Sequence, residues 1–184
     1  MIHPLVSIKP ERRISYFIPL LAGALWLIIV MNIIGAPLNT TQAPYGIVSF
    51  EFAGTLAKAE AMMASWGAGG ITRAAFIQGL DFLFPLVYSG AIGLGCIMAG
   101  GALQERKWPL AGLGGACAWG IWLAAGLDYI ENVALTALLF GAAGDGWAML
   151  AALCAVVKFL LIFLGMVYAL YGLVIRMVIA KPGS

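Results

Sequence analysis

Three polar residues that could bind a ligand or transfer protons lie close together in an apolar stretch of the chain. This stretch runs from Trp108 to Gly141, and the polar residues in it are Asp128, Glu131 and Asn132. Spacings of three and four residues place all three on one face of a helix. A charge at bilayer depth costs about 2.5–3.5 kcal/mol on insertion scales. Two carboxylates and an amide in this position therefore predict a site.

Charged residues in two other apolar stretches extend this set. Counting about 1.5 Å per residue from the outer end of each predicted helix places four of them roughly 12–20 Å deep; these are Asp81, Asp128, Glu131 and Lys158. Tyr88 lies seven residues after Asp81 on the same helix face, and Pro85 cannot donate a hydrogen bond to the carbonyl of Asp81. We expect the four charged residues to form one inward-facing cluster, because each alone is costly in lipid.

The charge balance of this cluster leaves several roles open. Three carboxylates exceed the single lysine, so either one carboxyl stays protonated or a cationic ligand supplies the missing charge. In the first case Asp81, Asp128 and Glu131 would be the catalytic residues of an acid–base enzyme of the isomerase or cyclase type. In the second case the cluster holds the polar end of an amphipathic small molecule or lipid. The cluster could also fix helix register, or meet the helix of a partner in a larger complex.

Binding is favoured over catalysis because other catalytic signatures are missing. The chain has no nucleophile beside a base at helical spacing and no glycine loop of the phosphate-binding kind. The single histidine, His3, precedes the first apolar stretch, which argues against haem or histidine-bound zinc among the helices. The three cysteines lie within apolar stretches and lack metal-binding spacing. We therefore expect no metal and no cofactor, and whether the chain is an enzyme stays open.

The composition sets the class of protein in which this cluster must be held. Of 184 residues, 63% are hydrophobic and only 10% are charged, which predicts an integral membrane protein. The net charge is +2 and the basic residues lie at the ends of apolar stretches, so we expect no nucleic-acid partner. We expect membrane lipids to surround the chain. The sequence also leaves open whether the chain forms a homodimer or joins a larger membrane complex.

The apolar stretches predict an all-α fold. Four membrane-spanning helices are expected to form a bundle, over residues 14–35, 71–103, 108–141 and 147–180. Between the first two spans, apolar residues recur at helical spacing and predict an amphipathic interfacial helix over residues 49–66; they are Phe52, Leu56, Ala59, Met63 and Trp66. Residues 14–180 would form a single transmembrane domain between a leader, residues 1–13, and a tail, residues 181–184.

The basic residues outside the apolar stretches predict the orientation. Lys9, Arg12 and Arg13 lie in the leader, and Arg106 and Lys107 lie between the second and third spans. The loop between the third and fourth spans has no lysine or arginine. Because basic residues gather on the cytoplasmic side, both termini are expected to be cytoplasmic, and the polar layer lies toward the outer face.

Several motifs of this chain resemble a known family. They are Phe50-Glu51-Phe52-Ala53-Gly54-Thr55, Leu80-Asp81-Phe82-Leu83-Phe84-Pro85 with Tyr88, Asp128-x-x-Glu131-Asn132-Val133-Ala134-Leu135, and Lys158-Phe159. Together they resemble a family of small, largely uncharacterised bacterial four-transmembrane-helix proteins, over roughly residues 47–171. The resemblance implies a four-helix fold in the bacterial cytoplasmic membrane and a site at these motifs, but no activity. The expected ligand-binding residues are then Glu51, Asp81, Tyr88, Asp128, Glu131, Asn132 and Lys158.

Overall fold

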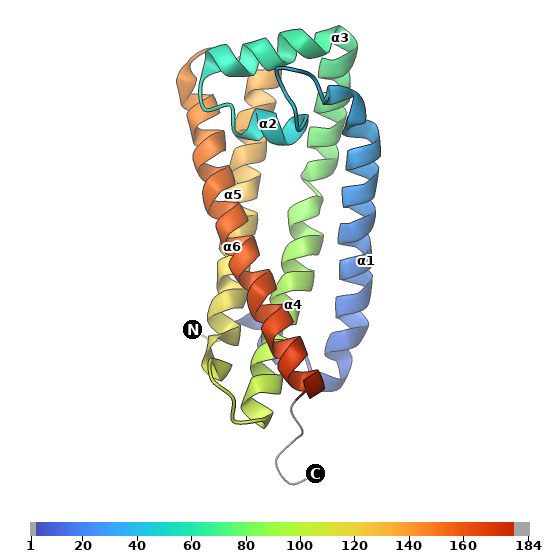
Figure 1. Cartoon of the computed structure of the whole chain (residues 1–184), viewed down its shortest axis with the longest axis vertical. Coiled ribbons are helices and arrows are strands. Elements are labelled where there is room, and N and C mark those ends of the chain that lie inside the picture. The colour runs from blue at the N-terminus through green and yellow to red at the C-terminus, as the bar shows by residue number, and fades with distance from the viewer. Residues whose placement is uncertain (1–2, 179–184) are drawn as a thin grey trace. The chain divides into compact units, whose positions relative to one another are not determined.

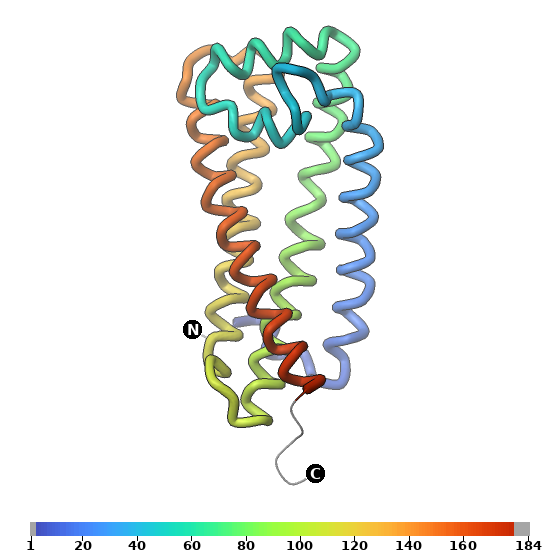
Figure 2. The backbone as a smooth tube through the Cα atoms, viewed as in Figure 1, coloured from blue at the N-terminus to red at the C-terminus, as the bar shows by residue number. Residues whose placement is uncertain are grey.

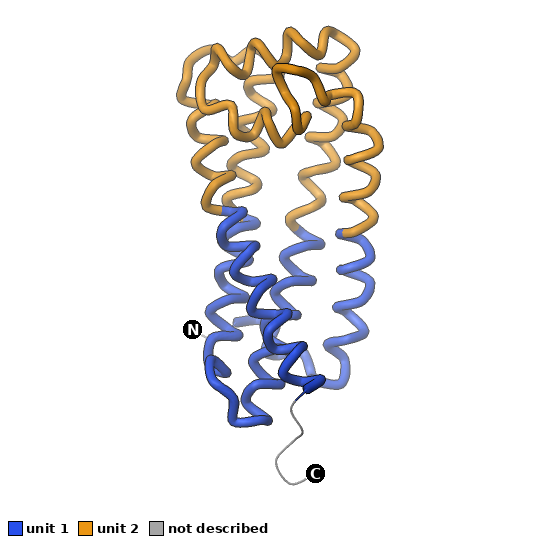
Figure 3. The backbone as a smooth tube through the Cα atoms, in the orientation of Figure 1, with its two compact units in different colours: residues 1–24, 86–125, 158–184 blue, residues 25–85, 126–157 orange. Residues whose placement is uncertain are grey.

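The computed structural model describes residues 3–178, and the predicted tail lies outside these residues. Within that range every regular element is a helix and none is a β-strand. The chain forms two compact units, shown in different colours in Figure 3. Unit 1 comprises residues 1–24, 86–125 and 158–184, and unit 2 comprises residues 25–85 and 126–157. Four helices, α1, α4, α5 and α6, contribute residues to both units (Figures 1 and 3).

Four helices are long and apolar enough to cross a membrane, which confirms the all-α prediction with four candidate spans. These helices are α1 (Pro10–Gly35), α4 (Phe84–Glu105), α5 (Gly114–Leu139) and α6 (Asp145–Val178). The stretch predicted as one span over residues 71–103 is divided, because α3 (Leu56–Asp81) ends where α4 is about to begin. Pro85 has no backbone N–H to continue the ladder of α3, and it fits the first turn of the new helix α4.

The segment predicted as one interfacial helix is also divided. It forms α2 (Ile47–Glu51) and the first part of α3, separated by Gly54 with a φ of +71°. Thr55 then caps α3, because its side chain accepts a hydrogen bond from the backbone N–H of Lys58. Beyond this break, the apolar face predicted for the helix is the one that packs inward; its residues are Leu56, Ala59, Met63 and Trp66.

The helix α3 changes direction at Gly67. This glycine has φ +63° and ψ −178°, a conformation that side-chain-bearing residues avoid. The part of α3 before Gly67 runs crosswise at one end of unit 2, and the part after it runs along the other helices of that unit (Figures 1 and 2). One glycine therefore separates a cross-lying segment, residues 56–66, from the segment that carries Gln78 and Asp81.

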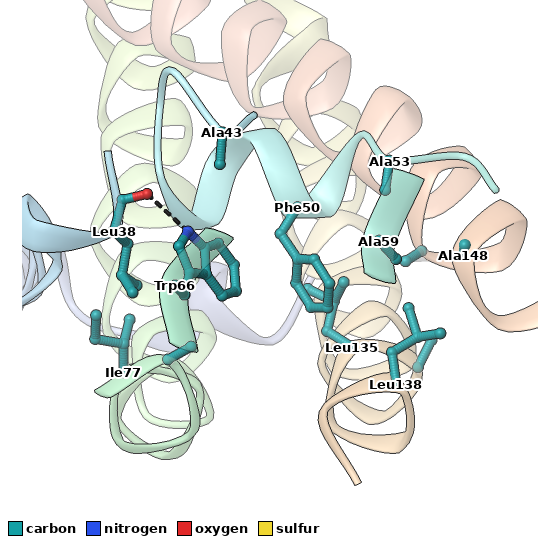
Figure 4. Close-up of a cluster of buried hydrophobic side chains, with 13 residues drawn as sticks. Leu38, Ala43, Phe50, Ala53, Ala59, Trp66, Ile77, Leu135, Leu138 and Ala148 are labelled. Carbon is teal, nitrogen blue, oxygen red and sulfur yellow. Dashed lines mark hydrogen bonds between the residues drawn. The ribbon is translucent and has the colours of Figure 1, made fainter. Parts of the chain in front are cut away.

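Unit 2 is held together by a cluster of buried apolar side chains and by hydrogen bonds to backbone atoms (Figure 4). The indole of Trp66 donates a hydrogen bond of 2.8 Å to the carbonyl of Leu38 and lies 5.3 Å from the ring of Phe50. At the other end of the cross-lying segment, Asp145 Oδ1 accepts a hydrogen bond of 2.7 Å from the backbone N–H of Leu56. Both ends of residues 56–66 are therefore fixed to distant parts of the chain.

In unit 1, the described part of the predicted leader contains a short helix and one buried side chain, His3. Residues Pro4–Ser7 form a 3-10 helix that His3 caps, because His3 Nδ1 accepts a hydrogen bond of 3.1 Å from the backbone N–H of Leu5. The imidazole is 1% exposed and contacts the rings of Trp119 and Trp122 edge-on, at centroid distances of 4.7 and 4.4 Å. Burial lowers the pKa of His3 below its usual 6.5, because the charged form loses its hydration.

Close approach of α4 and α6 in unit 1 depends on a glycine. A Cβ atom added to Gly172 would lie 2.5 Å from the Cα atom of Ala99, closer than real Cβ contacts allow. Small residues at such positions let helix backbones approach closely.

Candidate functional site

Five charged or amide side chains are almost completely buried in unit 2. Their exposed fractions are 6% for Glu51, 2% for Gln78, 2% for Asp128, 0% for Glu131 and 0% for Asn132. Glutamate and aspartate are seldom buried to this degree unless they are paired or used in function. The expected residue Asp81 also belongs to unit 2, where it is half-buried as the last residue of α3.

Two contacts fix α3 against α5 in unit 2. Gln78 Nε2 donates a buried hydrogen bond of 2.6 Å to Asn132 Oδ1. Four residues later, directly after the last residue of α3, the ring of Phe82 stacks on that of Tyr129, with 6.3 Å between centroids. The later residue, Phe82, contacts the earlier position of α5, Tyr129, whereas Gln78 contacts Asn132. The two segments are therefore antiparallel. Asp81 lies between these contacts on the chain, which brings it alongside the part of α5 that holds Asp128, Glu131 and Asn132.

The buried apolar cluster of unit 2 follows the polar residues along one face of α5. Leu135 and Leu138 lie four and seven residues after Glu131, so they continue the same face. Phe50 of α2 belongs to this cluster, and Figure 4 shows its ring beside Leu135. Glu51 follows Phe50 at the end of α2, so this packing is what positions the carboxylate in unit 2.

Hydrogen bonds satisfy the polar atoms of this set only in part. None of Glu51, Asp81, Asp128 and Glu131 is without a partner. Asn132 accepts from Gln78, but its Nδ2 atom makes no hydrogen bond to any described part of the chain. A buried donor without an acceptor costs about 1–3 kcal/mol. The site therefore contains one amide donor that the described residues leave unused.

Gln78 is the residue of this set that the sequence interpretation did not assign to the site. Its signal was present, since a glutamine interrupts an apolar stretch three residues before Asp81 and so lies on the same helix face. A neutral amide costs less in an apolar setting than a carboxylate does, so it is a weaker signal of a site. Its partner Asn132 could not be identified without the register of α3 against α5.

Two expected site residues belong to unit 1. Tyr88 lies in α4 and Lys158 in α6, and they are 3% and 4% exposed. The Lys158 ammonium lies 5.0 Å from the ring centroid of Phe159, and both residues take part in further interactions. The burial of both side chains agrees with the inward direction expected for them. Their membership of the cluster in unit 2 stays a prediction.

A groove on the surface of unit 2 is separate from the buried polar residues. It is lined by Gln42, Phe52, Ala57, Lys58, Ala61 and Met62. None of the five buried polar side chains takes part in its lining. Across residues 3–178, no three histidine, cysteine, aspartate or glutamate residues are grouped so that they could hold a metal ion.

In comparisons with known protein families, curated proteins and solved structures, nothing matches this chain.

Proposed function

We propose that this chain is an integral protein of the bacterial cytoplasmic membrane that binds or carries an amphipathic small molecule or lipid. The observation that carries the proposal is the burial of Glu51, Asp128 and Glu131 together with the amides Gln78 and Asn132 in unit 2. Buried charges stabilise a fold poorly, because desolvation offsets most of their attraction to a partner. A role in binding the polar end of a ligand explains why apolar side chains do not occupy these positions.

Insertion into a membrane is supported by the apolar surface of the candidate spans. On α1 and α6 many large apolar side chains are strongly exposed, among them Trp26 (61%), Ile33 (70%), Leu153 (61%) and Met177 (78%). Soluble proteins rarely expose apolar surface on this scale. Lipid tails are the surroundings that make such side chains favourable, and the basic residues of the leader support an orientation with both termini in the cytoplasm.

The cross-lying segment of α3 supports a placement of the site near the outer face. Residues 56–66 bury Ala59 and Trp66 and expose Lys58 and Glu60, as a helix at a membrane interface does. Under the proposed orientation this segment lies at the outer interface, above the polar residues of α3 and α5. The ligand then has its polar end at Asp81, Asp128 and Glu131 and its apolar part among the helices.

Native mass spectrometry of the purified protein, combined with one carboxylate variant, tests this proposal. We expect the wild type to retain a co-purified amphipathic molecule and Asp128→Asn to lose most of it, because the amide is nearly isosteric but uncharged. Glu60→Gln is the matched control, since it removes an exposed carboxylate of the same unit. Its occupancy should equal that of the wild type.

Two results would contradict the proposal. One is a wild type that carries no amphipathic molecule and binds none when lipid extracts are added. The other is equal occupancy in Asp128→Asn and Glu60→Gln. In either case the buried carboxylates would be a device for helix packing.

A further inference from the structure

The unused donor of Asn132 indicates which polar group the ligand carries. Asn132 is 0% exposed, and its Oδ1 atom already accepts the hydrogen bond from Gln78 Nε2 at 2.6 Å. Its Nδ2 atom has no acceptor among the described residues. The Gln78 contact holds the amide in place, so the donor cannot turn away without losing that bond. A ligand that binds here is therefore offered a hydrogen-bond donor as well as carboxylate oxygens.

We infer that the polar end of the ligand is a neutral hydroxyl group, which accepts a hydrogen bond from Asn132 Nδ2 and donates one to a carboxylate of α5. This inference rests on the proposed function and narrows its ligand to amphipathic alcohols. Asp128 precedes Asn132 by one helical turn on the same face, so a hydroxyl oxygen near both can use the donor and the acceptor together.

Other common head groups cannot both accept a hydrogen bond from Asn132 Nδ2 and lie favourably beside the carboxylates of α5. A quaternary ammonium group has neither a donor nor an acceptor, and a primary ammonium group can only donate, so both leave Asn132 Nδ2 unused. A ligand carboxylate could accept from Asn132, but it would lie beside Asp128 and Glu131 and be repelled by them. The hydroxyl group alone among these satisfies the amide and suits the negative surroundings.

The test compares four probes that share one alkyl chain and differ in the head group. The purified protein in phosphatidylcholine nanodiscs is melted with 1-dodecanol, dodecylamine, dodecyltrimethylammonium or dodecane, each at the same mole fraction of the lipid. We expect 1-dodecanol to raise the melting temperature and the other three to raise it far less, because a ligand that binds only the folded state stabilises it.

Variants of two asparagines connect this effect to the proposed donor. Asn132→Leu should weaken 1-dodecanol binding about tenfold, as expected for the loss of one hydrogen bond to the ligand. Asn32→Leu is the matched control, because the Nδ2 atom of Asn32 already donates to the carbonyl of Ile28 at 2.8 Å. If Asn132→Leu does not fold, Asn132→Asp keeps an oxygen for Gln78 and removes the donor, and it should show the same loss.

Different outcomes would contradict the hydroxyl inference and the proposed binding function. If dodecylamine or dodecyltrimethylammonium stabilises as well as 1-dodecanol, and both Asn132 variants keep that effect, the hydroxyl inference is wrong while binding of an amphipathic molecule stands. If no probe changes the melting temperature of any variant, the proposed function fails together with the inference. A 1-dodecanol effect that Asn32→Leu loses and Asn132→Leu keeps would also overturn the inference.

Discussion

Gln78 and Asn132 depend on each other, because their side chains share one buried hydrogen bond. Gln78→Leu leaves the Oδ1 atom of Asn132 without its partner, so we expect a loss of about 1–3 kcal/mol in stability. The double variant Gln78→Leu with Asn132→Leu removes both polar groups and should lose less than the sum of the two single variants. Thermal unfolding in detergent measures this, and strictly additive losses would contradict a shared bond.

His3 gives the stability of the protein a dependence on pH. Its pKa is lowered in the folded protein by burial against Trp119 and Trp122, so the folded state binds a proton less readily than the unfolded chain. The stability it contributes is complete above the unfolded pKa of about 6.5 and is lost as the pH falls from there through the lower folded pKa.

The measurement for His3 is the melting temperature between pH 8 and pH 5. His3→Asn keeps an acceptor for the backbone N–H of Leu5 but does not titrate. We expect the fall in melting temperature below about pH 6.5 to be smaller in this variant than in the wild type. Identical pH profiles would show that the imidazole does not contribute.

At the scale of the helices, Gly67 determines where α3 turns. Gly67→Ala forces a side chain into φ +63°, and although the added Cβ has open space, we expect a loss of about 1–3 kcal/mol from backbone strain. Gly69→Ala is the matched control, because its Cβ also has open space and its φ is ordinary. That variant should be neutral or slightly more stable. Equal melting temperatures for both variants would argue against the turn at Gly67.

Gly172 allows a second comparison between helices, in unit 1. Gly172→Ala places a Cβ 2.5 Å from Ala99 Cα, so α4 and α6 must separate, and we expect overpacking to cost about 1–3 kcal/mol. Gly101→Ala in α4 meets nothing within 4 Å and should leave the melting temperature unchanged or higher. If the two variants melt alike, this close approach does not limit stability.

The sequence predicted helices and their inward faces well, and breaks between helices poorly. Periodicity and apolar length identified the four candidate spans, because both depend on local composition. The two breaks have local causes too, at Gly54 and Pro85, but each also needs the surrounding structure to accept a new helix start. Gln78 is visible in the sequence as a polar residue in an apolar stretch, but its partner Asn132 lies 54 residues away, and local patterns do not identify a contact over that separation.

At the scale of the whole molecule, the orientation can be measured by labelling single cysteines in a variant without Cys96, Cys117 and Cys154. Ala143→Cys, in the loop before α6, should react with an impermeant maleimide only from outside the cell. Gln104→Cys, beside Arg106 and Lys107, should react only from the cytoplasmic side. Both cysteines should react after solubilisation in detergent, and the mirrored pattern in cells would reverse the proposed orientation.

The hydrogen bond from Leu56 to Asp145 also orders events while the chain is being made. The two residues are 89 positions apart, so the first turn of α3 has no such cap until the start of α6 has been synthesised. At about 5–20 residues per second, that delay is on the order of 5–20 seconds. Ala59, three residues after Leu56 in α3, packs in a cluster that includes Ala148 and Ala151, which are synthesised after Asp145. During translation the cross-lying segment is thus made well before the neighbours that fix its first turn.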